Sequence, residues 1–135
     1  MPFASVYVGN ATTGIALDLK RNIQAGTNAK VVDEAKQAQA IVEFTQETRE
    51  KEILSLTAAG RVREFRLRYR VGVRVHDGKG GTYVPQTALE LTRDVSFNDA
   101  EVLAKEAEEQ LLFRDMQTDM VQQIMRLLSA AQKPA

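Results

Sequence analysis

Six arginines between Arg61 and Arg74 are the residues of this sequence best suited to binding a charged ligand. From Glu64 to Val75 polar and apolar residues alternate, and most of the polar positions are arginines. Because a guanidinium group donates two parallel hydrogen bonds to a phosphate or a carboxylate, the row indicates one of two arrangements. It forms an anion-binding surface, or it forms ion pairs with acids on neighbouring strands. The acids expected as partners in the second arrangement are Glu43, Glu47, Glu90 and Asp94.

The other reactive residues do not form a catalytic or metal-binding pattern. His76 is the only histidine and stands at the entrance of a predicted hairpin, where a surface role is favoured. The glycine-rich residues 78–81 connect two strands, whereas a phosphate-binding loop precedes a helix. The sequence contains no cysteine, and no pair of acids has the apolar surroundings typical of an acid–base couple. We predict a protein without enzymatic activity, cofactor or metal.

The alternation itself predicts the element that carries the arginines. A period of two is that of a β-strand with one apolar and one polar face. Turn signals at residues 58–60 and 77–81 join this strand to its neighbours in sequence as an antiparallel meander. Residues 30–33 are expected to form only a brief extended piece. The four predicted strands cover residues 3–8, 40–56, 61–76 and 82–97.

Two helices are predicted from apolar residues that recur every three or four positions. The first covers residues 13–25 with a cap at Thr12 or Thr13, and the second covers residues 98–131 with a capping box that begins at Asn98. Each helix has a single apolar stripe, so both should lie on one face of the sheet, opposite the arginines. We expect Leu103, Leu111 and Ile124 to be buried against Leu19, Leu67 and Leu91.

The order β-α-β-β-β-α predicts an α+β fold in a single domain over residues 1–135. This fold is a two-layer sandwich with a four-stranded, mostly antiparallel sheet and two helices on one face. Lysine and arginine number 18, as do aspartate and glutamate, so the net charge is zero and general attraction to nucleic acid is not predicted. No apolar run approaches the roughly 20 residues that a membrane helix needs, and no signal peptide is recognised.

The C-terminal part of the sequence resembles the ending of the LptE family of outer-membrane lipopolysaccharide-assembly lipoproteins. The shared pieces are an R-x-x-x-F-[ND] strand end at residues 93–98, an A-L-A-K-like helical turn at residues 103–106, and a closing Q-[IL]-x-R-x-L at residues 123–128. Their order and spacing are similar to those of the family over nearly the whole chain.

The resemblance implies a location and a function. Family members are lipid-anchored through an N-terminal cysteine to the periplasmic leaflet of the outer membrane. They lie largely inside the β-barrel of the partner LptD as a plug, bind lipopolysaccharide, and help to insert it into the outer leaflet. Because this sequence has neither a leader nor the anchoring cysteine, we expect it to be the mature part of a longer protein.

The resemblance also implies site residues. Lys105 matches one of two basic positions that the family uses for lipopolysaccharide binding. The other position aligns with Ala58, so Arg61 and Arg63, shortly after the turn, are expected to substitute for it. For the barrel, we expect one end of the sheet to enter with a hairpin tip. The expected ligand residues are Lys105, Arg61, Arg63, Arg66 and Arg68, and the expected partner contacts are Gly60, Lys79 and Gly80.

An RNA-binding module is the alternative function, since a sheet with one basic face and two helices behind it resembles RNA-binding architecture. Base-stacking aromatic residues should then lie on the exposed face. Here Phe65 and Tyr69 alternate to the apolar side, which disfavours this alternative. A small hydrolase would need a nucleophile beside a base, and the sequence shows no such pair.

Overall fold

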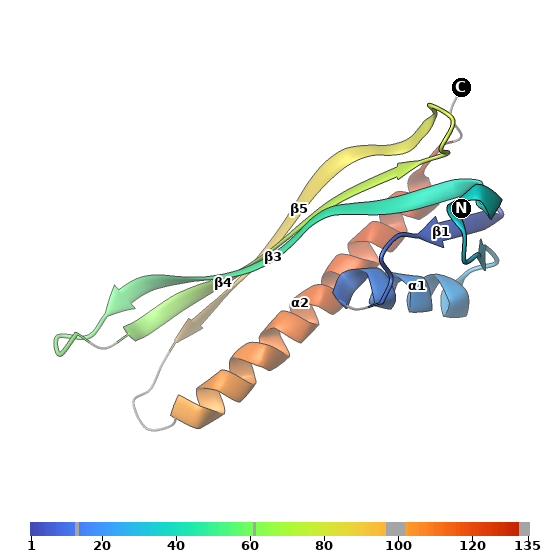
Figure 1. Ribbon diagram of the computed structural model, residues 1–135. Helices are drawn as coiled ribbons and strands as arrows, with labels where there is room; N and C mark the ends of the chain where they lie inside the picture. The colour runs from blue at the N-terminus through green and yellow to red at the C-terminus, as the bar shows by residue number, and fades with distance from the viewer. Residues whose placement is uncertain (13, 61, 97–101, 133–135) are drawn as a thin grey trace.

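The computed structural model describes residues 1–12, 14–60, 62–96 and 102–132, and the side chains of residues 62 and 102–105 lie outside this description. Its elements follow the predicted order, with one short strand and one short 3₁₀ helix in addition (Figure 1). In chain order they are β1 (Ser5–Val8), α1 (Gly14–Gly26), β2 (Lys30–Val31), the 3₁₀ helix η1 (Ala35–Gln37), β3 (Ala40–Leu56), β4 (Val62–His76), β5 (Thr82–Ser96) and α2 (Val102–Ala130).

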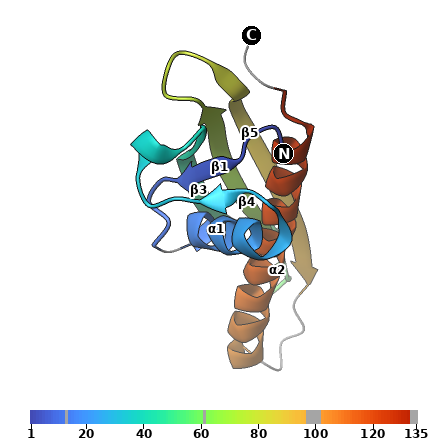
Figure 2. The same cartoon turned by 90° about the vertical axis from the view of Figure 1, so that its right-hand side faces the viewer.

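The described strands form one sheet in the order β2-β1-β3-β4-β5. β1 pairs in parallel with β2 and β3, whereas the three long strands pair antiparallel. Both helices lie on one face, so the predicted α+β sandwich is confirmed (Figures 1 and 2). The sheet has five strands instead of four, because Lys30 and Val31 pair with β1. Two residues are too few to show a periodic pattern in the sequence.

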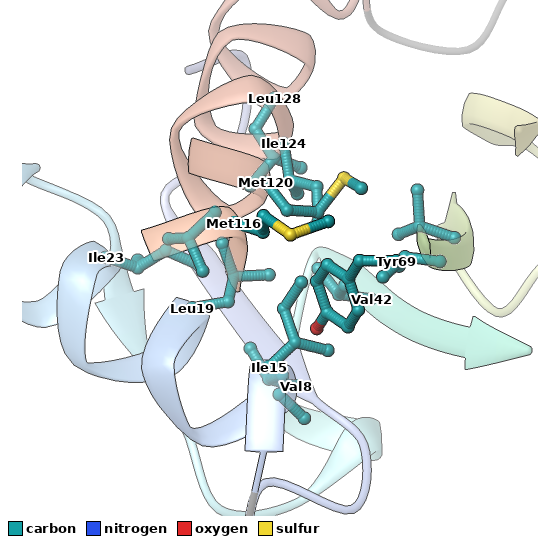
Figure 3. Close-up of a cluster of buried hydrophobic side chains, with 14 of the residues drawn as sticks. Val8, Ile15, Leu19, Ile23, Val42, Tyr69, Met116, Met120, Ile124 and Leu128 are labelled. Carbon is teal, nitrogen blue, oxygen red and sulfur yellow. The ribbon is translucent and has the colours of Figure 1, made fainter. Parts of the chain in front are cut away.

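The core lies between the sheet and the two helices, where the predicted apolar stripes meet. Figure 3 shows side chains of α1 and α2 converging on Val42 and Tyr69 of the sheet. Leu19, Leu67 and Ile124 are fully buried, as predicted, and Leu91 is half-buried. The buried helical residues drawn there are Ile15, Leu19, Ile23, Met116, Met120, Ile124 and Leu128.

The prediction that Leu111 is buried is wrong, because its side chain is 57% exposed. With 3.6 residues per turn, Leu111 lies about 160° around α2 from Phe113, which is buried against the sheet. The prediction followed a spacing of four residues from Leu103 to Leu111, whereas the buried stripe of α2 contains Phe113 and Met116. The side chain of Leu103 lies outside the described residues.

Beyond α1 the three long strands continue as an arm, which α2 accompanies (Figure 1). We define the arm as residues 46–56, 62–72 and 88–96. The register shifts on both sides of β4 where the arm begins, with Thr45 as the extra residue of β3. Across Gly72, the side-chain amide of Gln86 donates to the hydroxyl of Thr45 at 2.7 Å. A Cβ at residue 72 would collide with this hydroxyl, so the hydrogen bond between Gln86 and Thr45 requires glycine at this position. The hydrogen bond lies where the bulges bend the sheet.

Candidate ligand and partner surfaces

The arginines of β4 lie on the outer face of the sheet, opposite the helices, and carboxylates of β3 and β5 hold them. Arg66 Nε lies 2.8 Å from Asp94 Oδ1 and Arg74 Nη2 lies 2.6 Å from Glu43 Oε2. Arg68 contacts three acids: Glu90 at 2.9 Å, Glu52 at 3.3 Å and Glu50 at 3.8 Å. Arg70 shares Glu50 and Glu90 with it. We call this set the arginine ladder.

The arginine ladder is compensated in charge, and acids outnumber arginines on this face. The hydrogen bond from Arg74 holds the pKa of Glu43 below its ordinary value, and the hydrogen bond from Arg66 does the same for the pKa of Asp94. The sequence allowed either an anion-binding surface or ion pairs with acids on neighbouring strands, and the structure has the ion pairs. The four arginines of the described face are Arg66, Arg68, Arg70 and Arg74, and its six acids are Glu43, Glu50, Glu52, Glu64, Glu90 and Asp94.

Two consequences follow for binding at this face. A phosphate group that binds Arg66 or Arg68 must displace a carboxylate, so a ligand role for these two residues stays a prediction. On the outer face of the arm, within the described residues, there is no phenylalanine, tyrosine or tryptophan, and Phe65 and Tyr69 are buried under the helices. Base stacking, the interaction that the RNA-binding alternative needs, therefore finds no support on this face.

Glu47, expected as a partner of the arginines, lies on the helix side of the sheet instead. The extra residue Thr45 reverses the faces of β3, because a shift by one residue turns every side chain over. Glu47 Oε2 accepts the Tyr69 hydroxyl at 2.6 Å and the backbone amide of Ile15 at 3.2 Å. A carboxylate of β3 thus caps the start of α1, where Thr12 or Thr13 was expected. Thr13 lies outside the described residues.

The next two residues on the helix side of β3 are also charged, and they hold α2 over the arm. Arg49 Nη2 donates to Gln117 Oε1 at 2.7 Å and its guanidinium lies 5.4 Å from the ring centre of Phe113. Lys51 Nζ lies 3.1 Å from Glu109 Oε2 and 4.4 Å from the ring centre of Phe65. The sequence did not predict these contacts, because Arg49 and Lys51 are charged residues and do not resemble the buried face of a strand.

The free end of the arm is amphipathic. Ile53 and Leu56 are 57% and 56% exposed, and the bulge residue Leu54 is 38% exposed. Arg63 is exposed beside them, and in the described part of the chain it has no ion pair. We call residues 53–60 and 63 the arm tip. The expected ligand residues therefore do not form one group. Arg63 lies at the arm tip, and Arg66 and Arg68 lie in the arginine ladder. Arg61 and the side chain of Lys105 lie outside the described residues.

The turn between β4 and β5 lies at the opposite end of the sheet from the arm tip (Figure 1). Asp77 Oδ1 accepts the backbone amides of Lys79 at 2.7 Å and Gly81 at 2.8 Å, and these bonds lower the pKa of Asp77. Lys79 is exposed, and a Cβ at Gly80 would have nothing within 4 Å. His76 accepts the Gly78 amide and contacts Glu43, in agreement with a structural role in the turn.

The remaining described surface offers open hollows. One hollow of about 660 Å³ lies where residues 1–4 meet the ends of α1 and α2, at Gly26 and Ser129. Within the described residues, no three histidine, aspartate or glutamate side chains gather closely enough to hold a metal ion. In the same residues, no helix combines the length and the apolar character needed to cross a membrane.

Comparison with protein families gives one match over most of the chain. Residues 3–128 match the family model LptE, described as lipopolysaccharide-assembly. Among curated proteins, none matches the sequence significantly. The matched residues include all of the arm and the core of both helices.

Several solved structures have the same fold. Lipoprotein B from Nitrosomonas europaea, described as uncharacterized, is 46% identical with a TM-score of 0.81, and the match covers 93% of this chain and 82% of that one. The rare lipoprotein B from Shewanella oneidensis is 23% identical with a TM-score of 0.78, covering 93% and 92%. A minor lipoprotein from Acinetobacter baumannii is 23% identical with a TM-score of 0.73, covering 97% and 94%. The last two show the fold alone.

Proposed function

Because this chain belongs to the LptE family of lipopolysaccharide-assembly proteins, we propose that it is a non-enzymatic assembly factor of the outer membrane. In this proposal it binds lipopolysaccharide and plugs the β-barrel of LptD while lipopolysaccharide enters the outer leaflet. A lipid anchor ahead of residue 1 holds it at the periplasmic face. The lipoprotein neighbours support a place in the cell envelope.

The arm tip is the observation that carries the ligand part of the proposal. Lipopolysaccharide combines phosphate groups with acyl chains, so its site must offer cationic and apolar groups side by side. The arm tip places the exposed Arg63 next to Ile53, Leu54 and Leu56. In the arginine ladder, by contrast, each cation already holds a carboxylate. Arg61, which is close to Arg63 in sequence, and Lys105, which matches a basic position of the family, join Arg63 as the proposed ligand residues.

Reversing the charge of these three residues tests the ligand site. We expect the triple variant Arg61→Glu, Arg63→Glu and Lys105→Glu to bind lipopolysaccharide at least about tenfold more weakly, because each charge-assisted contact contributes about 1.5–3 kcal/mol. Binding is measured by titration with purified lipopolysaccharide, and the thermal midpoint of each variant is recorded.

A triple variant with the same change in net charge is the matched control. Arg21→Glu, Arg114→Glu and Arg126→Glu alter exposed helical positions, and we expect binding to be retained. A separate pair, Arg66→Gln and Arg68→Gln, measures the contribution of the arginine ladder. If the first triple variant is folded and binds like the wild type, Arg61, Arg63 and Lys105 are not the site.

The barrel part of the proposal concerns the two hairpin turns. A plug must present a polar surface to a lumen that is itself polar. The arginine ladder and both turns lie away from the helices, which leaves the outer helical faces in water. Since the turns lie at opposite ends of the sheet, one of them enters the barrel and the other stays outside.

Insertions into the turns identify which end enters. We expect a five-residue glycine–serine insertion at Gly60 or at Gly80, but not at both, to abolish co-purification with LptD from outer membranes. Both glycines have positive φ values, 79° and 90°, and a Cβ would have nothing within 4 Å, so the insertions leave the core intact. The exposed Lys79 lies beside the second site. Co-purification of both insertion variants would contradict docking by a hairpin tip.

A further inference from the structure

The two edges of the sheet differ greatly in length. β2 forms one edge with two residues, whereas β5 forms the other with 15. Figure 2 shows β5 along the margin of the sheet beside α2. An edge strand presents unpaired backbone groups that accept a further strand, and proteins usually shorten, charge or cover such edges. The edge at β2 is short, but the edge at β5 is long.

A side-chain contact shows which backbone groups of β5 point away from β4. The guanidinium of Arg93 donates to the carbonyl oxygen of Thr92 at 2.8 Å, which is possible only where this carbonyl faces the open edge. In an antiparallel strand, residues that face the neighbour alternate with residues that face away. The outward amides and carbonyls therefore belong to Ala88, Glu90, Thr92 and Asp94, and no described strand pairs with them. The guanidinium of Arg93, which also lies 2.8 Å from Asp119 of α2, must leave the Thr92 carbonyl before a strand can bind there.

The side chains along this edge define the chemistry of a strand that fits there. On the helix side, Leu89 and Leu91 are only half-buried. On the outer side, the carboxylates of Glu90 and Asp94 are 44% and 57% exposed. A complementary strand alternates apolar residues, which cover the two leucines, with basic or hydroxyl residues, which meet the two acids.

A second copy of this chain fits the edge poorly in the registers centred on residues 90–92. When two β5 strands pair antiparallel with their helix-side faces on the same side, one residue lies opposite its own copy at the centre of the pair. If the pairing is centred on Glu90, the two copies of Glu90 lie opposite each other. If it is centred on Thr92, Glu90 of one copy lies opposite Asp94 of the other. Like charges opposite each other are destabilising in both cases. Centred on Leu91, it sets Arg93 opposite Leu89, which leaves a guanidinium on an apolar residue.

We propose that the open edge of β5, residues 88–94, pairs with an extended segment of the barrel protein and so adds a sixth strand to the sheet. The inference rests on the function proposed above, because it takes the barrel protein as the partner. Main-chain hydrogen bonds contribute the affinity in this mode of recognition, and the alternating pockets contribute the specificity. The edge then orients the plug in addition to the hairpin tip.

Proline at Thr92 tests the proposal, since it removes an amide that faces the edge and leaves the bonds to β4 in place. We expect Thr92→Pro to fold, by circular dichroism, and to recover at least about tenfold less barrel protein from outer membranes. Thr92→Ala, which keeps the amide, should recover as much as the wild type. Recovery with Thr92→Pro equal to that of the wild type overturns the inference and leaves the proposed function standing. Failure of the wild type to recover the barrel overturns both.

Hydrogen exchange in the wild type covers the case in which Thr92→Pro does not fold. In the free chain, we expect the amides of Glu90 and Thr92 to exchange faster than those of Leu89 and Leu91, which face β4. In the complex, the outward amides should become at least about tenfold slower. Equal exchange rates of Glu90 and Thr92 in the free chain and in the complex would overturn the inference.

Discussion

Replacing Tyr69 with alanine is expected to lower the free energy of unfolding by about 3–5 kcal/mol, which is the usual cost of removing a large aromatic side chain from a core. Tyr69 has no exposed surface and packs where α1, α2 and β3 converge. Its removal also leaves Glu47 with one hydrogen bond fewer. The measurement is urea unfolding followed by circular dichroism. Since small domains have about 5–15 kcal/mol in total, the variant should be only marginally folded.

Tyr69→Phe is the control, because it keeps the ring and removes the hydroxyl. We expect a loss of about 1.5–3 kcal/mol, the contribution of one hydrogen bond to a charged carboxylate. A loss as large as that of Tyr69→Ala would mean that the hydroxyl, rather than the packed ring, provides the stability at this position.

The stability of the wild type and that of Tyr69→Phe should depend differently on pH. Burial, and then the hydrogen bond to Glu47, raise the pKa of Tyr69 above the value of about 10 in an unfolded chain. A folded-state pKa above the unfolded one gives stability that is complete below about pH 10 and is lost as the pH rises further. The wild type should therefore lose stability above pH 10 more steeply than Tyr69→Phe. Equal slopes would contradict a raised pKa at Tyr69.

Gly14→Val is expected to lower the free energy of unfolding by about 2–4 kcal/mol. Gly14 has a φ of 65°, which costs other residues about 1–2 kcal/mol. Its Cβ would also lie 2.7 Å from Glu47 Oε1, the neighbour of the oxygen that caps α1, and the loss of a cap costs about 0.5–2 kcal/mol. Urea unfolding again provides the measurement, with loss of helical signal at lower urea than in the wild type.

Gly60→Val separates the two contributions. Gly60 also has a positive φ, 79°, but a Cβ there would have nothing within 4 Å. This variant therefore carries the backbone strain without the collision. We expect it to lose about 1–2 kcal/mol, clearly less than Gly14→Val. If the two variants are equally destabilised, the contact of Glu47 with α1 contributes nothing measurable.

The sequence predicted the elements with strong periodicity well. Strict alternation over residues 64–75 placed β4 and its two faces correctly, and it allowed the ion pairs that Glu43, Glu90 and Asp94 form. The stripe of Ile15, Leu19 and Ile23 likewise placed α1 on the core. In both cases each residue follows the geometry of its own element, so local pattern is sufficient.

Features that depend on pairing between distant residues were beyond the sequence pattern. The extra residue Thr45 turns Glu47 toward the helices, and nothing in the composition of residues 44–47 marks a bulge. After Thr45 the alternation shifts by one residue, so that Glu47, Arg49, Lys51 and Ile53 share the helix side of β3. This series is mostly charged, so its sequence does not resemble that of a strand packed in a core. The same limit applies to the arm tip, whose exposed leucines have the composition of buried ones.

The capping of α1 by Glu47 constrains the order in which the chain folds. The carboxylate lies 32 residues beyond the amide that it caps, so the start of the helix is complete only after β3 has docked. A helix of 13 residues is marginal on its own, and a distant strand holds the amide of the second residue of this one. The meander of β3, β4 and β5, whose neighbours are close in sequence, can form earlier. We therefore expect the first helix of the chain to be among the last elements to become stable, at the slower rates typical of non-local contacts.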